Sequence, residues 1–323
     1  MPQDTLITVD HVSRFYGDTC VVKDINLEVG RGEVIGFLGP NGAGKSTTMQ
    51  MISGNLAPSA GRIFINGTDI LDDPKNAKAQ LGYLSEQPPL YRELTVDEYL
   101  NHCARLNRIA KANVSSAMDN AKQRCGLTDV GHRLIGNLSK GFQQRVGIAQ
   151  AIIHSPPVVI LDEPTVGLDP IQIREIRDLI RELGGEHSVI LSTHILPEVQ
   201  ATCDRVTIIN KGELALTDSI EGLSQRMQAT SLLLGMHRPP PAQALEVLEH
   251  VTDVEVLPEN QIRVHFSPDH DPAETITKLA VDQNWGLWQL TPERHSLEQI
   301  FIDITCKEQA ADVEQSSSGE TVP

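Results

Sequence analysis

The 323-residue sequence has few basic residues for its size. Lysine and arginine together number 27, against 43 aspartates and glutamates, and the formal net charge is −16. A protein that binds nucleic acid regardless of sequence needs a basic face, because lysine and arginine must neutralise the phosphates. The acidic balance argues against such binding, and we expect no nucleic-acid partner.

Long apolar runs and paired cysteines are also absent. Nowhere do 18 uncharged apolar residues occur together, and the opening MPQDTLITVDHV has no basic segment followed by an apolar run. No CxxC pair occurs, and so there is no zinc-ligand spacing, among Cys20, Cys103, Cys125, Cys203 and Cys306. These absences predict a protein of a reducing, cytoplasmic compartment that does not span a membrane.

The length exceeds one average domain, so we expect two. Up to about residue 221, buried-strand patterns such as EVIGFL and PVVILDEP alternate with helix patterns. The segment TVDEYL carries a capping box, Thr95 with Glu98, which opens a helical stretch at about 90–136. The pattern predicts an α/β sheet interrupted by a helical insertion.

Beyond residue 222 the pattern changes. Segments from SLLLGM to GLWQLT follow the order β, α, β, β, α, β, with PAQALEVLEHV (241–251) as the first helix. This order predicts a small α+β domain of the split βαβ, ferredoxin-like type over 222–306, with SLEQIFIDIT as a closing helix. The tail 307–323 has almost no large apolar residues, so we expect it to be disordered.

The strongest chemical motif is GPNGAGKS, which fits GxxxxGK[ST] between a predicted strand and a predicted helix. Backbone amides of such a loop surround phosphate oxygens at a helix N-terminus. Lys45 is expected to reach the β- and γ-phosphates, and Ser46 to ligate Mg²⁺. The alternative is a glycine-rich turn without a ligand. The predicted nucleotide-binding residues of this loop are Gly39, Pro40, Asn41, Gly42, Ala43, Gly44, Lys45, Ser46 and Thr47.

A second motif, VVILDEP, ends an apolar strand in two acids. Because successive side chains of a strand point to opposite faces, Asp162 and Glu163 face different places. Asp162 suits a Mg²⁺ ligand, and Glu163 suits the base that activates water. Taken alone, such a pair is usually a solvated strand end. After a phosphate-binding loop, the catalytic interpretation is favoured.

A third set of motifs narrows the class. LSKGFQQRVGIAQAI, LDEP, GLDP and STH occur in this order, and over about residues 5–220 the sequence resembles the ATP-binding cassette (ABC) family. The resemblance implies a P-loop NTPase fold with a β-subdomain and a helical subdomain. It implies that Ser139 and Gly141 are signature residues that contact the nucleotide held by a second cassette. It also places Asp169 in the aspartate loop, makes His194 the switch histidine, and assigns adenine stacking to Tyr16.

Each assignment has a plainer alternative. Ser139 could be only a helix N-cap, His194 only a structural histidine, and Tyr16 only a turn residue beside Gly17. The sequence also departs from the family pattern. Lys140 and Phe142 replace a glycine and a glutamine of LSGGQ, and Glu86 stands where the family has a glutamine that senses Mg²⁺. A carboxylate at Glu86 can still ligate Mg²⁺.

The Glu86 loop, together with SLEQIFIDIT, resembles the ATPases of type-2 exporters, including the gliding-motility-associated subgroup. The resemblance implies an ATP- and Mg²⁺-dependent ATPase that pairs with a second cassette. It also implies a separate transmembrane permease, with the chain on the cytoplasmic face of the membrane. Two alternatives stay open: a soluble cassette ATPase of DNA repair or translation, and a regulatory cassette that hydrolyses weakly.

Overall fold

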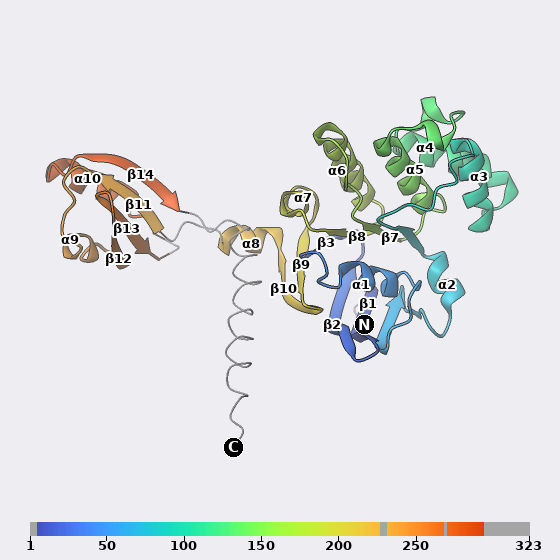
Figure 1. Cartoon of the computed structure of the whole chain (residues 1–323), viewed down its shortest axis with the longest axis horizontal. Coiled ribbons are helices and arrows are strands. Elements are labelled where there is room, and N and C mark those ends of the chain that lie inside the picture. Colours follow the sequence, from blue (N-terminus) through green and yellow to red (C-terminus); the bar gives the residue numbers. More distant parts are fainter. Residues whose placement is uncertain (1–4, 227–230, 268–269, 294–323) are drawn as a thin grey trace, which may run out of the picture. The chain divides into compact units, whose positions relative to one another are not determined.

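The computed structural model describes residues 5–226, 231–267 and 270–293. The chain divides into two compact units, Met1–Ile220 and Glu221–Pro323 (Figure 1). The predicted closing helix (296–305) and the predicted disordered tail (307–323) lie outside the described residues. Within the described residues, no helix is long and apolar enough to cross a membrane.

The first unit begins with an antiparallel sheet. Its order is β2-β1-β4-β5, formed by β1 (Thr5–Tyr16), β2 (Thr19–Gly30), β4 (Ala60–Ile65) and β5 (Thr68–Asp69). Every second residue is buried over much of β2, which is the alternation of a sheet with one face on a core. This sheet corresponds to the expected β-subdomain.

A second, six-stranded sheet forms the centre of the unit, in the order β10-β9-β3-β8-β7-β6. All neighbours pair in parallel except β9 and β10, which are antiparallel. Every residue of β3, β7 and β8 is buried, which explains their continuous apolar sequences. The strands are β3 (Val34–Leu38), β6 (Leu81–Leu84), β7 (Val158–Asp162), β8 (Ser188–Thr193), β9 (Arg205–Asn210) and β10 (Glu213–Ser219).

The register of this sheet brings three sequence motifs to one edge. Leu38 of β3 pairs with Thr193 of β8, and Asp162 of β7 pairs with Ser192 of β8. The glycine-rich loop, the LDE acids and the STH histidine therefore all follow strands that end at the same level. Ligands of open parallel sheets bind beyond this carboxyl edge.

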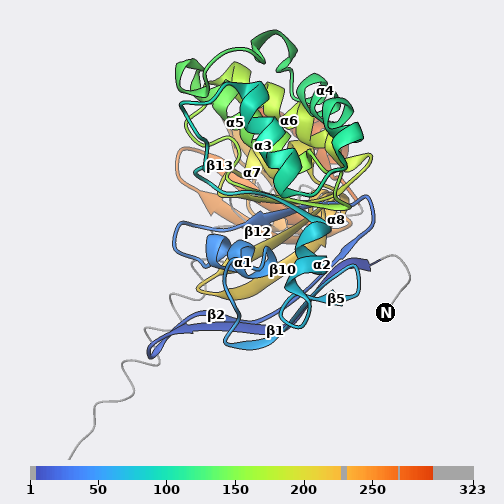
Figure 2. The ribbon, with the colours of Figure 1, turned by 90° about the vertical axis from the view of Figure 1, so that its right-hand side faces the viewer.

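Helices cover the two faces of the central sheet differently. The helix α1 (Lys45–Ile52) lies on the side of β1 and β2 (Figure 2). On the other side lie α3 (Val96–Leu106), α5 (Lys140–Ile152) and α6 (Pro170–Gly184). One hydrophobic core joins the antiparallel sheet, α1 and the central sheet, with Ile25, Met49 and Ile160 among its buried residues. Two further helices of this unit are α2 (Pro74–Ala79) and α7 (Leu196–Thr202).

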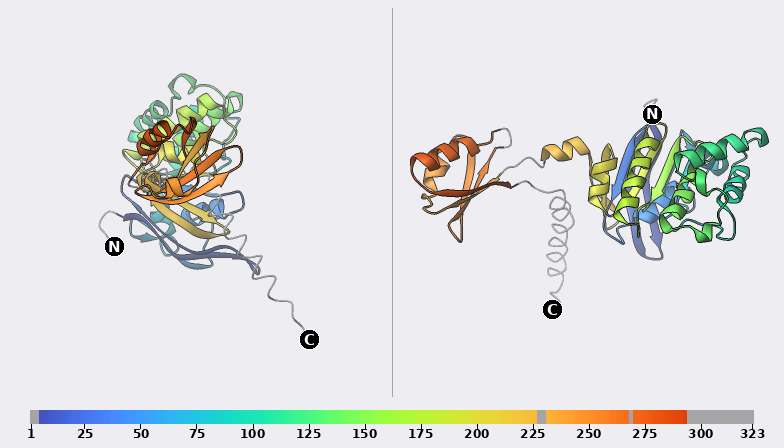
Figure 3. Two further views of the ribbon diagram at one scale, coloured as in Figure 1. Left: turned by 90° about the vertical axis from the view of Figure 1, so that its left-hand side faces the viewer. Right: turned by 90° about the horizontal axis from the view of Figure 1, so that it is seen from above.

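The predicted helical insertion is present. It contains α3 (Val96–Leu106) and α4 (Val114–Arg124) and leads into α5 (Lys140–Ile152), and Figure 3 (right) shows its green helices at one end of the unit. The capping box of Thr95 and Glu98 is confirmed, with hydrogen bonds in both directions. Short 3₁₀ turns occupy Lys111–Asn113, Thr128–Val130 and Ile135–Asn137.

A buried histidine fastens the insertion to the central sheet. Nε2 of His187 lies 3.1 Å from a guanidinium nitrogen of Arg124, and its Nδ1 lies 2.6 Å from the carbonyl oxygen of Pro156. Arginine can only donate, so Nε2 must accept and Nδ1 must carry the proton. Arg124 also pairs with Glu186 at 3.1 Å. The neutral ring therefore holds the end of α4 against the segments that flank β7 and β8.

The second unit contains α8 (Ile220–Arg226), which begins at the boundary, and a four-stranded antiparallel sheet in the order β12-β13-β11-β14. Its elements are β11 (Ser231–Met236), α9 (Gln243–Glu246), β12 (Val251–Leu257), β13 (Gln261–Phe266), α10 (Ala273–Asp282) and β14 (Leu287–Glu293). The alternation of strands and helices is the expected one. The ferredoxin-like classification stays a prediction.

One expected element of this unit is wrong in extent. The sequence predicts a helix over 241–251, but α9 covers only four residues and β12 begins at Val251. Three consecutive prolines precede α9, and proline cannot supply the backbone donors of a helix interior. At the other end, His250 adopts a left-handed conformation (φ 69°), which ends any helical path before the strand.

The His187 contacts predict pH-dependent stability. Burial lowers the pKa of His187 below the usual histidine value of 6.5, and the charge of Arg124 lowers it further. Below about pH 6.5 His187 therefore binds a proton more readily in the unfolded chain than in the folded one. The free energy of unfolding is highest above about pH 6.5 and decreases as the pH falls below it. His187→Gln keeps a donor and an acceptor without titrating. Its free energy of unfolding should therefore fall less than that of wild type when the pH is lowered below about 6.5, as measured by urea unfolding followed by circular dichroism.

The exposed His132 supplies the control, since His132→Gln should keep the pH dependence of the wild-type chain. If the free energy of unfolding decreased equally on acidification in His187→Gln and in wild type, His187 would not stay neutral in the folded chain.

Candidate nucleotide site

The glycine-rich loop connects β3 to α1 at the carboxyl edge of the central sheet. Gly44 is the residue before the helix and has φ 105°, a conformation that suits only glycine. A Cβ atom on Gly39 would collide with the backbone oxygen of Ile209 on the neighbouring strand β9. These two glycines let the loop turn tightly and bring its amides to the start of α1.

The loop opens into a pocket of about 450 Å³. Nine of its eleven lining residues are ones that the sequence predicts, and they come from the loop, from Glu86 and from the ends of β7 and β8. The pocket is lined by Val21, Asn41, Gly42, Gly44, Lys45, Ser46, Thr47, Glu86, Glu163, Val166 and His194. The predicted loop residues Gly39, Pro40 and Ala43 do not line it.

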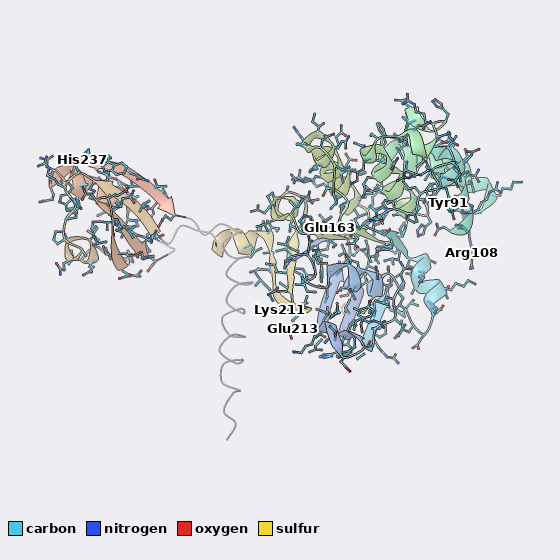
Figure 4. The ribbon with its side chains drawn as sticks, viewed as in Figure 1. Tyr91, Arg108, Glu163, Lys211, Glu213 and His237 are labelled. Carbon is cyan, nitrogen blue, oxygen red and sulfur yellow. The ribbon has the colours of Figure 1, made fainter. Side chains whose placement is uncertain are left out.

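Three charged or polar side chains meet at the pocket. Nζ of Lys45 lies 3.6 Å from Oε1 of Glu163, and Nδ1 of His194 lies 2.9 Å from Oε2 of the same carboxylate. Lys45 also donates to the carbonyl oxygens of Gly39 and Pro40, at 2.8 and 3.2 Å. Figure 4 shows Glu163 between the antiparallel sheet and the helical insertion. The carboxylate is thus held by a cation on one side and an imidazole on the other.

The backbone at Glu163 is strained. Its φ of 49° lies in the left-handed region, which is uncommon for residues other than glycine. Strain of this kind persists where the surroundings fix it, and it clusters at functional sites. Here the amide of Glu163 donates to the carbonyl oxygen of Ser192 at 2.9 Å. The turn directs a carboxylate that is only 6% exposed toward Lys45.

Asp162, the preceding residue, is buried at the end of β7. Burial raises its pKa above the usual aspartate value, the hydroxyls of Ser192 and Ser46 act in the opposite direction, and the negative charges of Glu163 and Glu86 raise it. Its Oδ1 atom has no hydrogen-bond partner among the described residues. A buried carboxylate oxygen without a donor, close to other carboxylates, is suited to a hard divalent cation.

The other predicted residues lie outside this pocket. Ser139 caps α5 by accepting from the amide of Phe142 at 3.4 Å, and Asp169 caps α6 by accepting from two amides. A Cβ atom on Gly141 would lie 2.6 Å from the side chain of Gln172, so α5 and α6 approach closely here. Lys140, the departure from the family signature, contacts Gly167 of its own chain. Neither Ser139 nor Gly141 lines the nucleotide pocket of its own chain.

Tyr16 also lies outside the pocket lining. It ends β1, is half exposed, and has the guanidinium carbon of Arg14 at 4.7 Å from the centre of its ring. Stacking of adenine on Tyr16 stays a prediction. Sequence reasoning missed Val21 and Val166 as lining residues, because an apolar residue in a strand or loop gives no chemical signal of its own.

The fold and the pocket define a P-loop nucleoside triphosphatase. A family model described as ABC transporter matches residues 22–166. The chain is 33% identical over 308 residues to the uncharacterized ABC transporter ATP-binding protein YdbJ of Bacillus subtilis, covering 95% of this chain and 97% of that protein. The bacitracin transport ATP-binding protein BcrA of Bacillus licheniformis is 34% identical over 305 residues, covering 93% of this chain and 97% of its own length.

A solved structure, described as the ATP binding subunit of an ABC transporter, matches with a TM-score of 0.63 at 32% identity. The match covers 68% of this chain and 92% of that one. The chain belongs to the ABC transporter family, and it is an ATP-binding subunit with ATPase activity. The family resemblance is thereby confirmed, and these relatives favour transport over the DNA-repair or translation alternative.

Removal of the loop lysine is the direct test of this pocket. Lys45→Ala deletes the ammonium that lies beside Glu163 and that is expected to contact the phosphates. We expect its ATPase rate to fall by about 10²- to 10³-fold, the usual loss when one electrostatic contact to a reacting group is removed. The assay compares steady-state phosphate release by the purified variant, by wild type and by Lys75→Ala, an exposed lysine on α2.

Wild-type and Lys75→Ala rates should agree. A wild-type rate as low as that of Lys45→Ala would instead identify a regulatory cassette with little hydrolysis.

Proposed function

We propose that this chain is the ATP-driven motor of an exporter and acts as a dimer on a separate membrane permease. The observation that carries the proposal is the Glu163 carboxylate, which lines the phosphate-loop pocket and is held between Lys45 and His194. This geometry supports hydrolysis with Glu163 as the base. The name of BcrA, a bacitracin transport ATP-binding protein, supports a role in transport.

In the proposed reaction, Glu163 accepts the proton of the attacking water. The γ-phosphate draws Lys45 away from the carbonyl oxygens of Gly39 and Pro40, because phosphate oxygens are stronger acceptors for an ammonium. His194 donates through Nδ1 to Glu163, since a carboxylate can only accept, and this contact orients the base. Binding of ATP would thus change the partner of Lys45 and leave Glu163 free to act.

The residues present fit a Mg²⁺ ion. Asp162 supplies an unpartnered buried oxygen, and Ser46 and Glu86 supply a hydroxyl and a carboxylate at the pocket wall. A bound Mg²⁺ ion would neutralise charge on the phosphates. Asp162, Ser46 and Glu86 are the residues that would hold it.

The signature residues support a dimer of cassettes. Ser139 and Gly141 begin α5 outside the pocket of their own chain, and the same holds for Asp169 at the start of α6. The amides at the start of α5 and the Ser139 hydroxyl favour an anion. A second copy would present these groups to the nucleotide held at Lys45, so two chains would complete two sites.

A cleft beside the helical insertion supports permease docking. It measures about 510 Å³ and lies among α1, α2, β6, α3 and α5. Its walls include Tyr91 and Leu106, large apolar residues that are 49% and 67% exposed. Exposed apolar walls of this kind are typical of interaction sites. With the permease bound there, the chain would lie on the cytoplasmic face of the membrane.

The dimer is tested by Glu163→Gln. This variant loses the base but keeps Lys45, so ATP should stay bound and hydrolysis should fall by at least about 10²-fold. We expect its mass by light scattering to double on addition of Mg²⁺ and ATP. The matched control, Glu163→Gln with Lys45→Ala, should remain monomeric because it lacks the phosphate contact. A monomer of Glu163→Gln with ATP bound would contradict the proposed dimer.

The metal assignment is tested by Asp162→Asn. The amide keeps the volume of the buried side chain and removes a charge whose burial is unfavourable, so the fold should survive. We expect the Mg²⁺ concentration for half-maximal ATPase activity to rise by about tenfold or more. Asp178→Asn, on the exposed face of α6, should leave it unchanged. An unaltered Mg²⁺ requirement in Asp162→Asn would exclude Asp162 as a metal ligand.

A further inference from the structure

A basic segment interrupts the acidic chain at the end of α3. Residues 99–118 contain no aspartate or glutamate, although acids outnumber bases by 43 to 27 in the whole sequence. Within seven residues they carry Arg105, Arg108 and Lys111, which are all exposed. These three residues are named the basic tip. Figure 4 shows Arg108 at the outer edge of the helical insertion.

The backbone at the centre of the basic tip does not call for an arginine. The amide of Arg108 donates to the carbonyl oxygen of Arg105, and that of Ile109 to Ala104, both at 3.0 Å, so α3 ends in a Schellman motif. Arg108 occupies the left-handed position of this motif, with φ 58°. Glycine or asparagine fits that position with less strain. Arginine stands there despite its backbone preference, which points to a use for its charge.

The basic tip also lacks partners within the chain. Among the described residues, no ion pair or side-chain hydrogen bond involves Arg105, Arg108 or Lys111. Two other cations of the insertion are paired: Lys122 with Asp97 at 2.7 Å, and Arg124 with Glu186 at 3.1 Å. The basic tip is therefore free to contact an anionic partner.

A groove between α3 and α4 adds apolar surface to these charges. Its volume is about 670 Å³, and Arg105 and Lys111 line it together with apolar residues. The remaining lining residues are Asn101, Ile109, Val114, Ser115 and Met118. Cations beside an apolar groove match a molecule with an anionic head and a hydrocarbon chain.

We propose that the basic tip binds anionic phospholipid headgroups at the membrane surface, with the groove receiving the glycerol and first methylenes of the lipid. This inference rests on the proposed function, which brings the chain to a membrane. The net charge of −16 does not prevent the contact, because salt screens charges beyond about 8 Å. Each cation near an anionic membrane surface strengthens binding by roughly fivefold, so three contribute about a hundredfold.

The test is co-flotation of the purified full chain with phosphatidylcholine vesicles that do or do not contain phosphatidylglycerol. Wild type should bind the phosphatidylglycerol vesicles at low salt and be released at high salt. Arg105→Gln, Arg108→Gly and Lys111→Gln combined should bind about a hundredfold more weakly. The control combines Arg31→Gln, Lys75→Gln and Arg181→Gln, exposed cations that remove the same charge elsewhere, and should bind like wild type.

Arg108→Gly alone separates a lipid contact from a structural role. Glycine relieves the left-handed strain, so the melting temperature should stay or rise while vesicle binding falls by roughly fivefold. Equal vesicle binding by wild type and the basic-tip variant, or no wild-type binding, would overturn the inference and show that the tip serves a protein partner or none. The ATP-dependent dimer of Glu163→Gln is measured without lipid, so it reports on the proposed function separately.

Discussion

The chemistry of this protein depends on the parallel register of three buried strands. Because β3, β7 and β8 end at one level, the phosphate loop, the LDE acids and the STH histidine are neighbours although 155 positions separate Gly39 from His194 (194 − 39). The register is itself fixed by burial: all residues of these strands are inside, so a slip by one residue would disturb packing on both faces.

At the ends of these strands, charged side chains determine the contacts within the pocket. Lys45 and His194 both contact the carboxylate of Glu163, and Lys45 also donates to a carbonyl oxygen of the loop. The neighbouring Asp162 is different, because it is buried among like charges and keeps an unpartnered oxygen. Glu163 has a cation and an imidazole beside it, whereas Asp162 keeps one oxygen without a donor, and this difference separates the base from the residue suited to a metal ion.

The helical insertion distributes its charges in a comparable way. Two of its cations pair with carboxylates outside the insertion, Arg124 with Glu186 and Arg145 with Glu175, and Arg145 also donates to the carbonyl oxygen of Cys125. Those at the far end of α3 hold none within the described chain, and an apolar groove lies beside them. The insertion thus has an inner face that fixes it to the motor and an outer end available to another molecule.

Much of the site is readable from sequence, because glycine patterns and acidic strand ends follow from local chemistry. GPNGAGKS predicts the loop, VVILDEP predicts Asp162 and Glu163, and Thr95 with Glu98 predicts a helix start, since a capping box involves only four residues. Helix extent is less local: α9 stops after four residues where the predicted helix continues to 251, because β12 pairs with β13 from Val251 onward. Val21, Val166 and the strained turn at Glu163 depend on contacts between distant segments. The sequence alone determined the class of chemistry, whereas the tertiary structure decided which residues share the pocket and which cations lack a partner, since both depend on distances between residues far apart in the chain.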